Sequence, residues 1–193
     1  MHPDTEPAAS GAEATPTTGT PARRTTRTLG LFTAVAVAAY TLDLVTKVLA
    51  VAELQDRAPV RVVGDLLQLT LVRNPGAAFS TGTSYTLVLS FIALAAVLVV
   101  LYVARTLSDR LWAIGLGFLL GGVLGNLTDR VFRSPAPFRG HVVDWVQLPH
   151  WPVFNVADMC IDVAAVVIVV QALRGVSPNG TRQQRERRRK DPA

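Results

Sequence analysis

The sequence predicts an all-α membrane protein with four transmembrane helices and a small extracytoplasmic β-structure between the first helix and the second. Half of the 193 residues are apolar, and the mean hydropathy is +0.34 although both ends of the chain are polar. The apolar residues gather into four runs, each close to the roughly 20 residues that an α-helix needs to cross a bilayer. Lys and Arg lie mainly at the two ends, as in proteins that follow the positive-inside rule.

Residues 1–28 are rich in Ala, Thr, Pro and Gly and lack periodic apolar positions, so we expect a disordered cytoplasmic extension. The first helix is predicted at about residues 29–50. A basic patch before an apolar run is also typical of a cleaved signal peptide. The run that begins at Leu29 is longer than the apolar core of such a peptide, and it contains Asp43 and Lys47, which favours a retained helix.

The segment after the first helix is predicted to form β-structure at about residues 55–80. Its sequence VRVVGDLLQLTLVRN mixes β-branched residues with partial alternation, which is typical of a hairpin or small sheet on the membrane surface. The turn Asn74-Pro75-Gly76 ends it. Three more helices are predicted at about residues 85–104, 111–131 and 154–173. Residues 29–173 therefore form the membrane domain, and residues 174–193 a basic, disordered cytoplasmic tail.

The distribution of basic residues predicts that both termini are cytoplasmic. With that orientation the outer segments hold only Arg57, Arg61, Arg73, Arg133 and Arg139. The inner segments hold Arg23, Arg24, Arg27, Arg105, Arg110, Arg174, Arg182, Arg185, Arg187, Arg188, Arg189 and Lys190. The sequence pI of about 10.1 does not indicate a nucleic-acid partner, because the basic residues form no face with interleaved aromatic residues.

Polar side chains within the predicted helices gather in one layer near the outer surface. A charged side chain in a membrane span costs about 2.5–3.5 kcal/mol on insertion scales, so this concentration indicates a site. The layer contains Asp43, Lys47, Asn126, Asp129, Arg130, Asn155 and Asp158, with Asp144 in the adjoining outer connection.

Several of these residues have structural as well as functional interpretations. Asp43 and Lys47 are four residues apart, so they either neutralise each other or position a substrate. Arg130 either extends to the interface or belongs to the site, and Asn126 with Asp129 either joins helices or lines the site. Asp162, one turn beyond Asp158, is expected to donate or accept a supporting hydrogen bond.

Asp144 and Asp158 have no basic residue four positions away, and both flank the start of the last helix. Two carboxylates held close together share a proton, so one acts as a general base on water while the other acts as a general acid. This is the chemistry of an aspartic peptidase. A transporter or a structural scaffold also buries acids, but an ion path would stop halfway because the inner halves of the helices carry few polar groups.

The remaining reactive residue types do not suggest a second chemistry. Cys160 is the only cysteine, and its apolar run indicates a buried hydrophobic residue rather than a nucleophile. The three histidines have no partners at ligand spacing, so no metal site is predicted.

Five segments occur in a fixed order: DLVTK, RNPGAAFS, GGVLGNLTDR, VVDW and FNVADMCID. Together they resemble the bacterial lipoprotein signal peptidases (signal peptidase II, aspartic peptidase family A8), especially those of actinobacteria. The resemblance extends from about Leu29 to Leu173. VVDW has Trp145 where many members of the family have Phe.

The resemblance implies a multi-pass aspartic endopeptidase of the bacterial cell membrane with its active site near the outer face. It implies cleavage of diacylglyceryl-modified prolipoproteins on the N-terminal side of the lipidated cysteine, with no metal or cofactor. Asp144 and Asp158 match the catalytic pair. The positions that bind substrate or support the site in the family correspond here to Asn74, Gly76, Asn126, Asp129, Arg130, Asn155, Asp43 and Lys47. The expected partners are prolipoproteins, membrane lipid and the inhibitor globomycin. We also expect a monomer, and residues 77–79 to cover the bound peptide.

Overall fold

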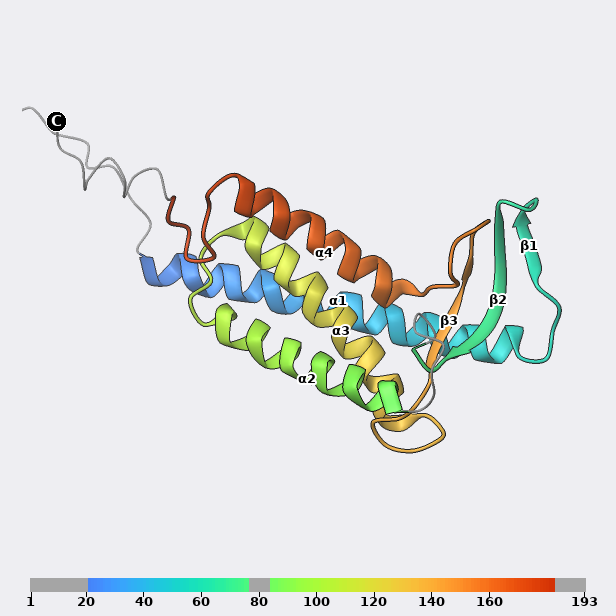
Figure 1. Cartoon of the computed structure of the whole chain (residues 1–193). Helices are drawn as coiled ribbons and strands as arrows, with labels where there is room; N and C mark the ends of the chain where they lie inside the picture. The colour runs from blue at the N-terminus through green and yellow to red at the C-terminus, as the bar shows by residue number, and fades with distance from the viewer. Residues whose placement is uncertain (1–20, 77–83, 183–193) are drawn as a thin grey trace, which may run out of the picture.

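The computed structural model describes residues 21–76 and 84–182, and it shows four long helices with a three-stranded sheet at one end (Figure 1). Each helix is long and apolar enough to cross a membrane, which confirms the predicted class. At about 1.5 Å per residue, the 21 residues of α2 span about 30 Å, the thickness of a bilayer core. The helices are α1 (Pro21–Leu54), α2 (Ser84–Ala104), α3 (Arg110–Phe132) and α4 (Val156–Leu173).

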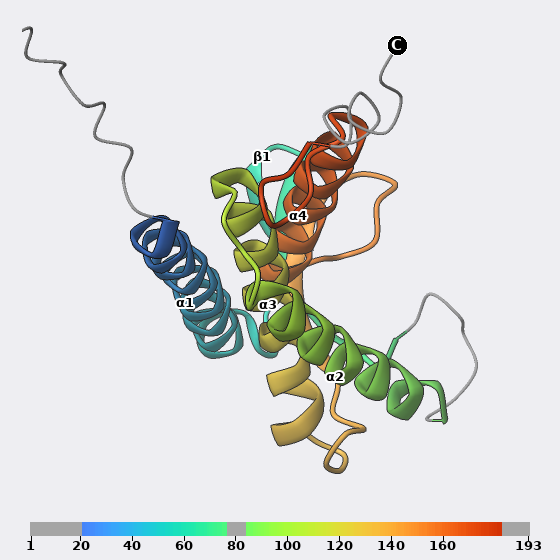
Figure 2. The ribbon, with the colours of Figure 1, turned by 90° about the vertical axis from the view of Figure 1, so that its left-hand side faces the viewer.

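Helix α3 is the centre of the bundle, and the other three helices pack around it (Figure 2). Its glycines make this possible, because a side chain at two of them would collide with neighbouring backbone. A Cβ at Gly121 would lie 2.7 Å from the carbonyl oxygen of Ala36 on α1, and one at Gly122 would lie 2.6 Å from that of Ala157 on α4. These small residues therefore let α1 and α4 approach α3 closely.

Apolar side chains divide between the interior and the outer faces of the helices. The buried apolar cluster includes Phe32, Leu116 and Leu120. Large apolar side chains are also exposed on the outer faces of α1, α2 and α4. They include Leu42, Val45, Phe91, Ile92, Val163 and Val166. Exposed apolar faces on helices of this length fit contact with lipid rather than water.

The sheet combines the predicted hairpin with a strand that the sequence did not indicate. Strands β1 (Val60–Val63) and β2 (Leu67–Asn74) form the hairpin, and β3 (Val142–Gln147) adds to β2 in antiparallel orientation. The sequence pattern before α4 predicted a simple connection there. Pairing of Val72 with Asp144 shows that this region instead carries one of the two candidate catalytic residues into the sheet.

The segments on both sides of the predicted membrane domain are more ordered than expected. Helix α1 begins at Pro21 rather than near residue 29, so part of the predicted extension is helical. Residues 174–182 are also ordered: Val176 pairs with Arg182, and the indole Nε1 of Trp112 donates to the Val176 carbonyl oxygen at 2.8 Å. Tertiary hydrogen bonds to α3 give this polar segment a defined structure. The expected cover at residues 77–79 lies outside the described residues.

Candidate active site

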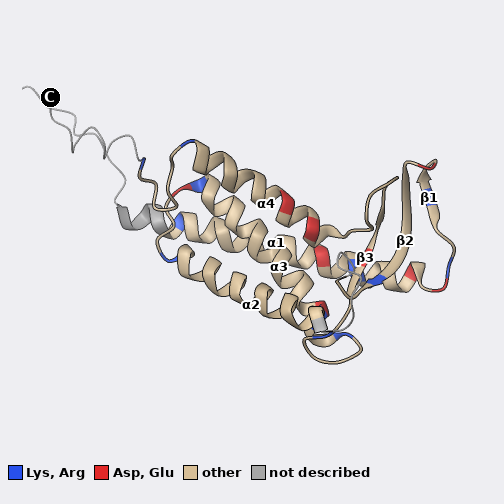
Figure 3. Cartoon of the chain, in the orientation of Figure 1, with Lys and Arg blue, Asp and Glu red and all other residues tan. Residues whose placement is uncertain are grey.

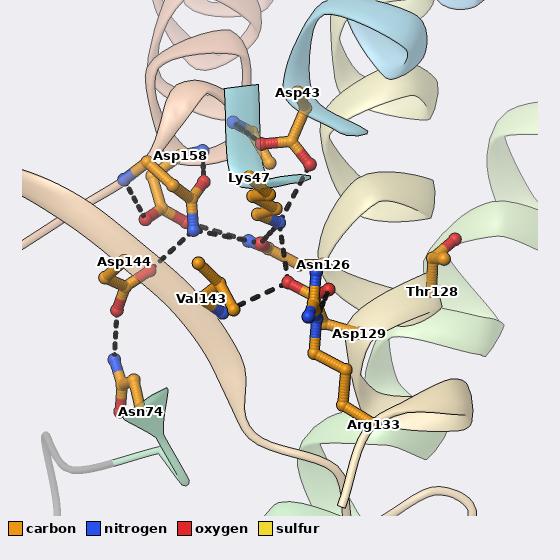
Figure 4. Close-up of polar contacts among 12 residues, drawn as sticks. Asp43, Lys47, Asn74, Asn126, Thr128, Asp129, Arg133, Val143, Asp144 and Asp158 are labelled. Atoms are coloured by element: carbon orange, nitrogen blue, oxygen red, sulfur yellow. Dashed lines mark hydrogen bonds and ion pairs between the residues drawn. The ribbon is translucent and has the colours of Figure 1, made fainter. Parts of the chain in front are cut away.

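Asp144 and Asp158 reach the same place from different elements, as Figure 4 shows. Asp144 lies on β3 and is 2 % exposed, whereas Asp158 lies in the first turn of α4. Asn155 is the N-cap of α4: its Oδ1 accepts from the Asp158 backbone N–H at 3.0 Å, and its own N–H donates to Asp158 Oδ2 at 3.2 Å. This capping box explains why α4 begins at Val156, after the predicted start, and it fixes the Asp158 carboxylate.

Asn155 also connects the two carboxylates. Because its Oδ1 accepts a backbone N–H, its amide nitrogen must face the other way. The Nδ2 group donates to Asp144 Oδ1 at 2.6 Å and to Asn126 Oδ1 at 3.2 Å. Asn155 is fully buried, so its amide group is shielded from bulk water.

Asn126 on α3 supplies the next hydrogen bond in the same network. Its Oδ1 accepts from the ammonium group of Lys47 at 2.9 Å as well as from Asn155. Since Lys47 can only donate, the Nδ2 group of Asn126 is directed at Asp158, and it donates to Oδ1 at 2.8 Å.

The turn after β2 holds a third amide against the site. Gly76 has φ +108°, a conformation that favours glycine, and its N–H donates to Asn74 Oδ1 at 2.8 Å. The Asn74 Nδ2 group therefore faces Asp144 and donates to Oδ2 at 2.8 Å. Both oxygens of Asp144 thus accept a hydrogen bond from a side-chain amide whose orientation is set by another group.

Lys47 is the cation at the base of this network. It is fully buried, and its Nζ forms ion pairs with Asp43 at 2.8 Å and with Asp129 at 3.0 Å. The Asp43–Lys47 ion pair, one of the two interpretations that the sequence allowed, is therefore present. Each partner carboxylate also accepts a backbone N–H from another element: Asp43 from Ala157 at 2.8 Å, and Asp129 from Val143 at 3.1 Å.

The Nη1 of Arg130 is buried and has no hydrogen-bond partner among the described residues, which agrees with the second of its two interpretations, a place in the site. Arg130 also interacts electrostatically with both Asp144 and Asp158. Within the same residues the side chain of Asp162 makes no hydrogen bond, so its expected supporting contact is not found. The sequence also did not suggest the ion pair between Asp129 and Arg133.

Two hydroxyl groups on α2 were not predicted from the sequence. Thr86 Oγ1 donates to the Pro75 carbonyl oxygen at 2.6 Å, and Ser90 Oγ donates to that of Phe138 at 2.7 Å. These contacts attach the turn that carries Asn74, and the connection before β3, to a membrane-spanning helix. The available signal was the i, i+4 spacing of two hydroxyl residues in an otherwise apolar run.

The pKa of Asp144 is raised to about 6. Burial is the largest cause, because it disfavours the charged carboxylate, and the negative charge of Asp158 acts in the same direction. The amides of Asn74 and Asn155 and the charge of Lys47 oppose the shift by favouring the ionised form. A carboxyl group with this pKa can hold or release a proton near neutral pH.

One buried and one partly buried aspartate, joined by amides at one end of four helices that are long enough to cross a membrane, are typical of an integral membrane protein with a candidate paired-aspartate site. The model of the family "Signal peptidase (SPase) II" matches residues 35–174. The chain belongs to this signal peptidase II family of aspartic peptidases.

Curated relatives agree with the family match. A lipoprotein signal peptidase of Rhodococcus jostii is 52 % identical over 141 residues, which cover 73 % of this chain and 71 % of the relative. One of Mycobacterium tuberculosis is 49 % identical over 149 residues, covering 77 % and 74 %. One of Streptomyces coelicolor is 46 % identical over 155 residues, covering 80 % and 76 %.

A solved structure supports the fold alone. It is described as a bacterial membrane enzyme, and it superposes with a TM-score of 0.67 at 24 % identity. The match covers 75 % of this chain and 94 % of that one. The four-helix bundle with its sheet is therefore shared with a known membrane enzyme.

Replacing the buried Lys47 should destabilise the protein far more than replacing the exposed Arg57, although each cation lies four residues from its acidic partner. Lys47→Met leaves Asp43 and Asp129 buried without their ammonium, and we expect a loss of about 3–5 kcal/mol. Arg57→Met removes an ion pair with Glu53 in which both side chains are more than half exposed, and we expect at most about 1 kcal/mol. Unfolding in detergent, followed by intrinsic fluorescence, compares the two variants. Equal effects would show that the buried network is not a major source of stability.

Proposed function

We propose that this chain removes the signal peptide of prolipoproteins by aspartyl catalysis, with Asp144 and Asp158 as the catalytic pair. Family membership supports the activity, and the named relatives are lipoprotein signal peptidases. The assignment of the pair rests on one observation: two aspartates from different elements are joined through the amide groups of Asn155 and Asn126. The scissile bond lies on the N-terminal side of the lipidated cysteine, as the resemblance implies.

The surroundings of the two carboxylates suggest how they divide the chemistry. Burial raises the pKa of Asp144, so Asp144 is the member that holds the shared proton. Asp158 lies in the first turn of α4, where the backbone N–H groups of the helix favour a negative charge, and it acts as the base. Asp158 takes a proton from water as the water oxygen attacks the scissile carbonyl, while Asp144 protonates the carbonyl oxygen. Asp158 then donates the proton it took from water to the amide nitrogen, Asp144 takes back a proton from a hydroxyl group of the gem-diol intermediate, and the C–N bond breaks to give the acid and the amine.

The position of the pair suits a substrate that is anchored in lipid. The sheet end of the bundle carries the acidic residues of α3 and α4 (Figure 3). Asp144 lies outside the helices and Asp158 in the first turn of α4, which supports a site at the boundary of the membrane. A diacylglyceryl group keeps its cysteine at this boundary. With both termini in the cytoplasm, as the basic residues indicate, the boundary is the outer one.

The catalytic assignment predicts that Asp144→Asn and Asp158→Asn each lower kcat by about a thousandfold or more, because each removes a group that transfers a proton. Asp162→Asn is the matched control: it lies on the same helix and its side chain makes no hydrogen bond within the described residues, so it should cleave at the wild-type rate. Cleavage of a diacylglyceryl-modified prolipoprotein in detergent measures all three, and globomycin should inhibit the wild type. Wild-type cleavage by either dyad variant would exclude the assignment.

The raised pKa of Asp144 predicts that kcat/KM falls as the pH rises through about 6, because the shared proton is then lost from the free enzyme. Asn74 donates to the ionised carboxylate and so lowers its pKa; Asn74→Ala should therefore move this limb of the profile to higher pH. Gln68→Ala, on the same strand, should leave the limb in place. A limb that stays fixed or moves to lower pH in Asn74→Ala would contradict the role given to Asp144.

The proposed orientation can be tested by cysteine labelling in cells, after replacement of the buried Cys160 by alanine. A membrane-impermeant maleimide should react from outside with a cysteine at Arg139, and it should reach one at Thr106 only after the membrane is opened. Both positions are exposed and lie at opposite ends of α3. The reverse pattern would place the catalytic pair at the cytoplasmic face.

A further inference from the structure

A polar cavity lies at the end of the bundle opposite the sheet. It has a volume of about 420 Å³ and is formed by the connection before α3, the end of α4 and the ordered turn that follows α4. Figure 3 shows basic segments at this end of the helices. Residues that line the cavity include Ser108, Arg110, Gln171, Arg174, Asn179 and Arg182.

Hydrogen bonds between the three segments give the cavity fixed walls. The Asp109 carboxylate accepts from the Trp112 backbone N–H at 3.0 Å and from the buried amide of Gln171 at 2.7 Å. The backbone N–H groups of Ser108 and Asp109 donate to the Pro178 carbonyl oxygen. These contacts attach the turn of residues 176–182 to the start of α3, so the cavity is part of the folded structure.

The cavity carries positive charge that the described residues do not neutralise. Arg110, Arg174 and Arg182 come from the three different segments, and none of them forms an ion pair with a carboxylate in residues 21–76 or 84–182. Asp109 also lines the cavity, and both of its hydrogen bonds are accepted by Oδ1, but its one negative charge balances only one of the three guanidinium groups. Guanidinium groups bind phosphate oxygens in pairs of hydrogen bonds, so three of them around one cavity suit a phosphate group.

Apolar side chains beside the cavity indicate the source of that phosphate. Leu111 on α3 and Val170 and Leu173 on α4 are exposed, and Leu173 is 84 % exposed. They lie on the helices whose ends form the cavity, so acyl chains could pack against them while a headgroup enters it. Basic cavities at the cytoplasmic ends of membrane helices bind anionic lipid headgroups in this way.

We infer that this cavity binds the phosphate of an anionic phospholipid in the leaflet opposite the catalytic pair. Arg110, Arg174 and Arg182 contact the phosphate oxygens, and Asn179 and Ser108 offer hydrogen bonds to the rest of the headgroup. The exposed leucines of α3 and α4 contact the acyl chains. A site of this kind attaches the cytoplasmic end of the bundle to the membrane surface independently of the substrate.

The experiment measures binding of short-chain phosphatidylglycerol, below its critical micelle concentration, to the purified full chain in a non-ionic detergent by microscale thermophoresis. We expect saturable binding that Arg110→Gln combined with Arg182→Gln weakens at least about tenfold, because two charge-assisted contacts are lost. Arg105→Gln is the matched control, since Arg105 lies at the same end of the bundle but outside the cavity, and it should change the Kd less than about twofold. The two single variants, each expected to weaken binding by a smaller factor, provide the same test if the double variant is poorly folded.

Three results would overturn the inference. An equal loss in Arg105→Gln would show attraction to diffuse surface charge rather than to a cavity. Saturation by inorganic phosphate, with displacement of the lipid at equal concentration, would show a site for free phosphate. Equal affinity for short-chain phosphatidylcholine would show that the anionic headgroup is not recognised. Cleavage of prolipoprotein at the wild-type rate by the double variant is expected in each case, so this test is separate from that of the catalytic pair.

Discussion

The buried ammonium group of Lys47 is the interaction on which the arrangement of the site depends. A buried charge is costly unless it is paired and hydrogen-bonded, so the elements around Lys47 must bring it partners. Asp43 comes from α1, and Asn126 and Asp129 come from α3. The same two carboxylates accept N–H groups from α4 and β3, through Ala157 and Val143. One cation thus fixes three helices and a strand relative to one another, and the contact between Arg133 and Asp129 supplies the second positive charge that balances the two acids.

This arrangement determines the hydrogen bonds and charges around the two candidate catalytic carboxylates. An asparagine amide can usually turn over and exchange donor for acceptor, but Lys47 and the Asp158 backbone N–H remove that freedom for Asn126 and Asn155. Their NH₂ groups must face the carboxylates. Burial favours the neutral acid, whereas the amides favour the anion. The balance of these opposing effects gives Asp144 a pKa of about 6.

Local sequence patterns predicted the parts of the structure that depend on neighbouring residues. Apolar runs of helical length located the four helices, and the four-residue spacing of Asp43 and Lys47 allowed the ion pair that is found. The contact of Asn74 with Asp144 joins residues 70 positions apart, and no local pattern contains it. Strand β3 was not predicted for the same reason: this short strand is ordered by its pairing with β2, which is distant in the sequence. The ordered turn after α4 has a polar composition, and its structure depends on distant contacts such as that of Trp112 with Val176.

The buried polar groups fall into two sets, one at each end of the helical bundle. One set surrounds Lys47 near the sheet, and another, with Thr28 and Gln171, lies at the opposite end. Between them the described part of the bundle is filled by apolar side chains such as Ala36, Leu120 and Val123. Among the described residues such a core offers no hydrogen-bonded route for ions or protons between the two faces, which argues against a transporter. It also means that the cavity at the other end has no polar connection through which to alter the dyad, so binding there would stabilise the fold without changing the chemistry.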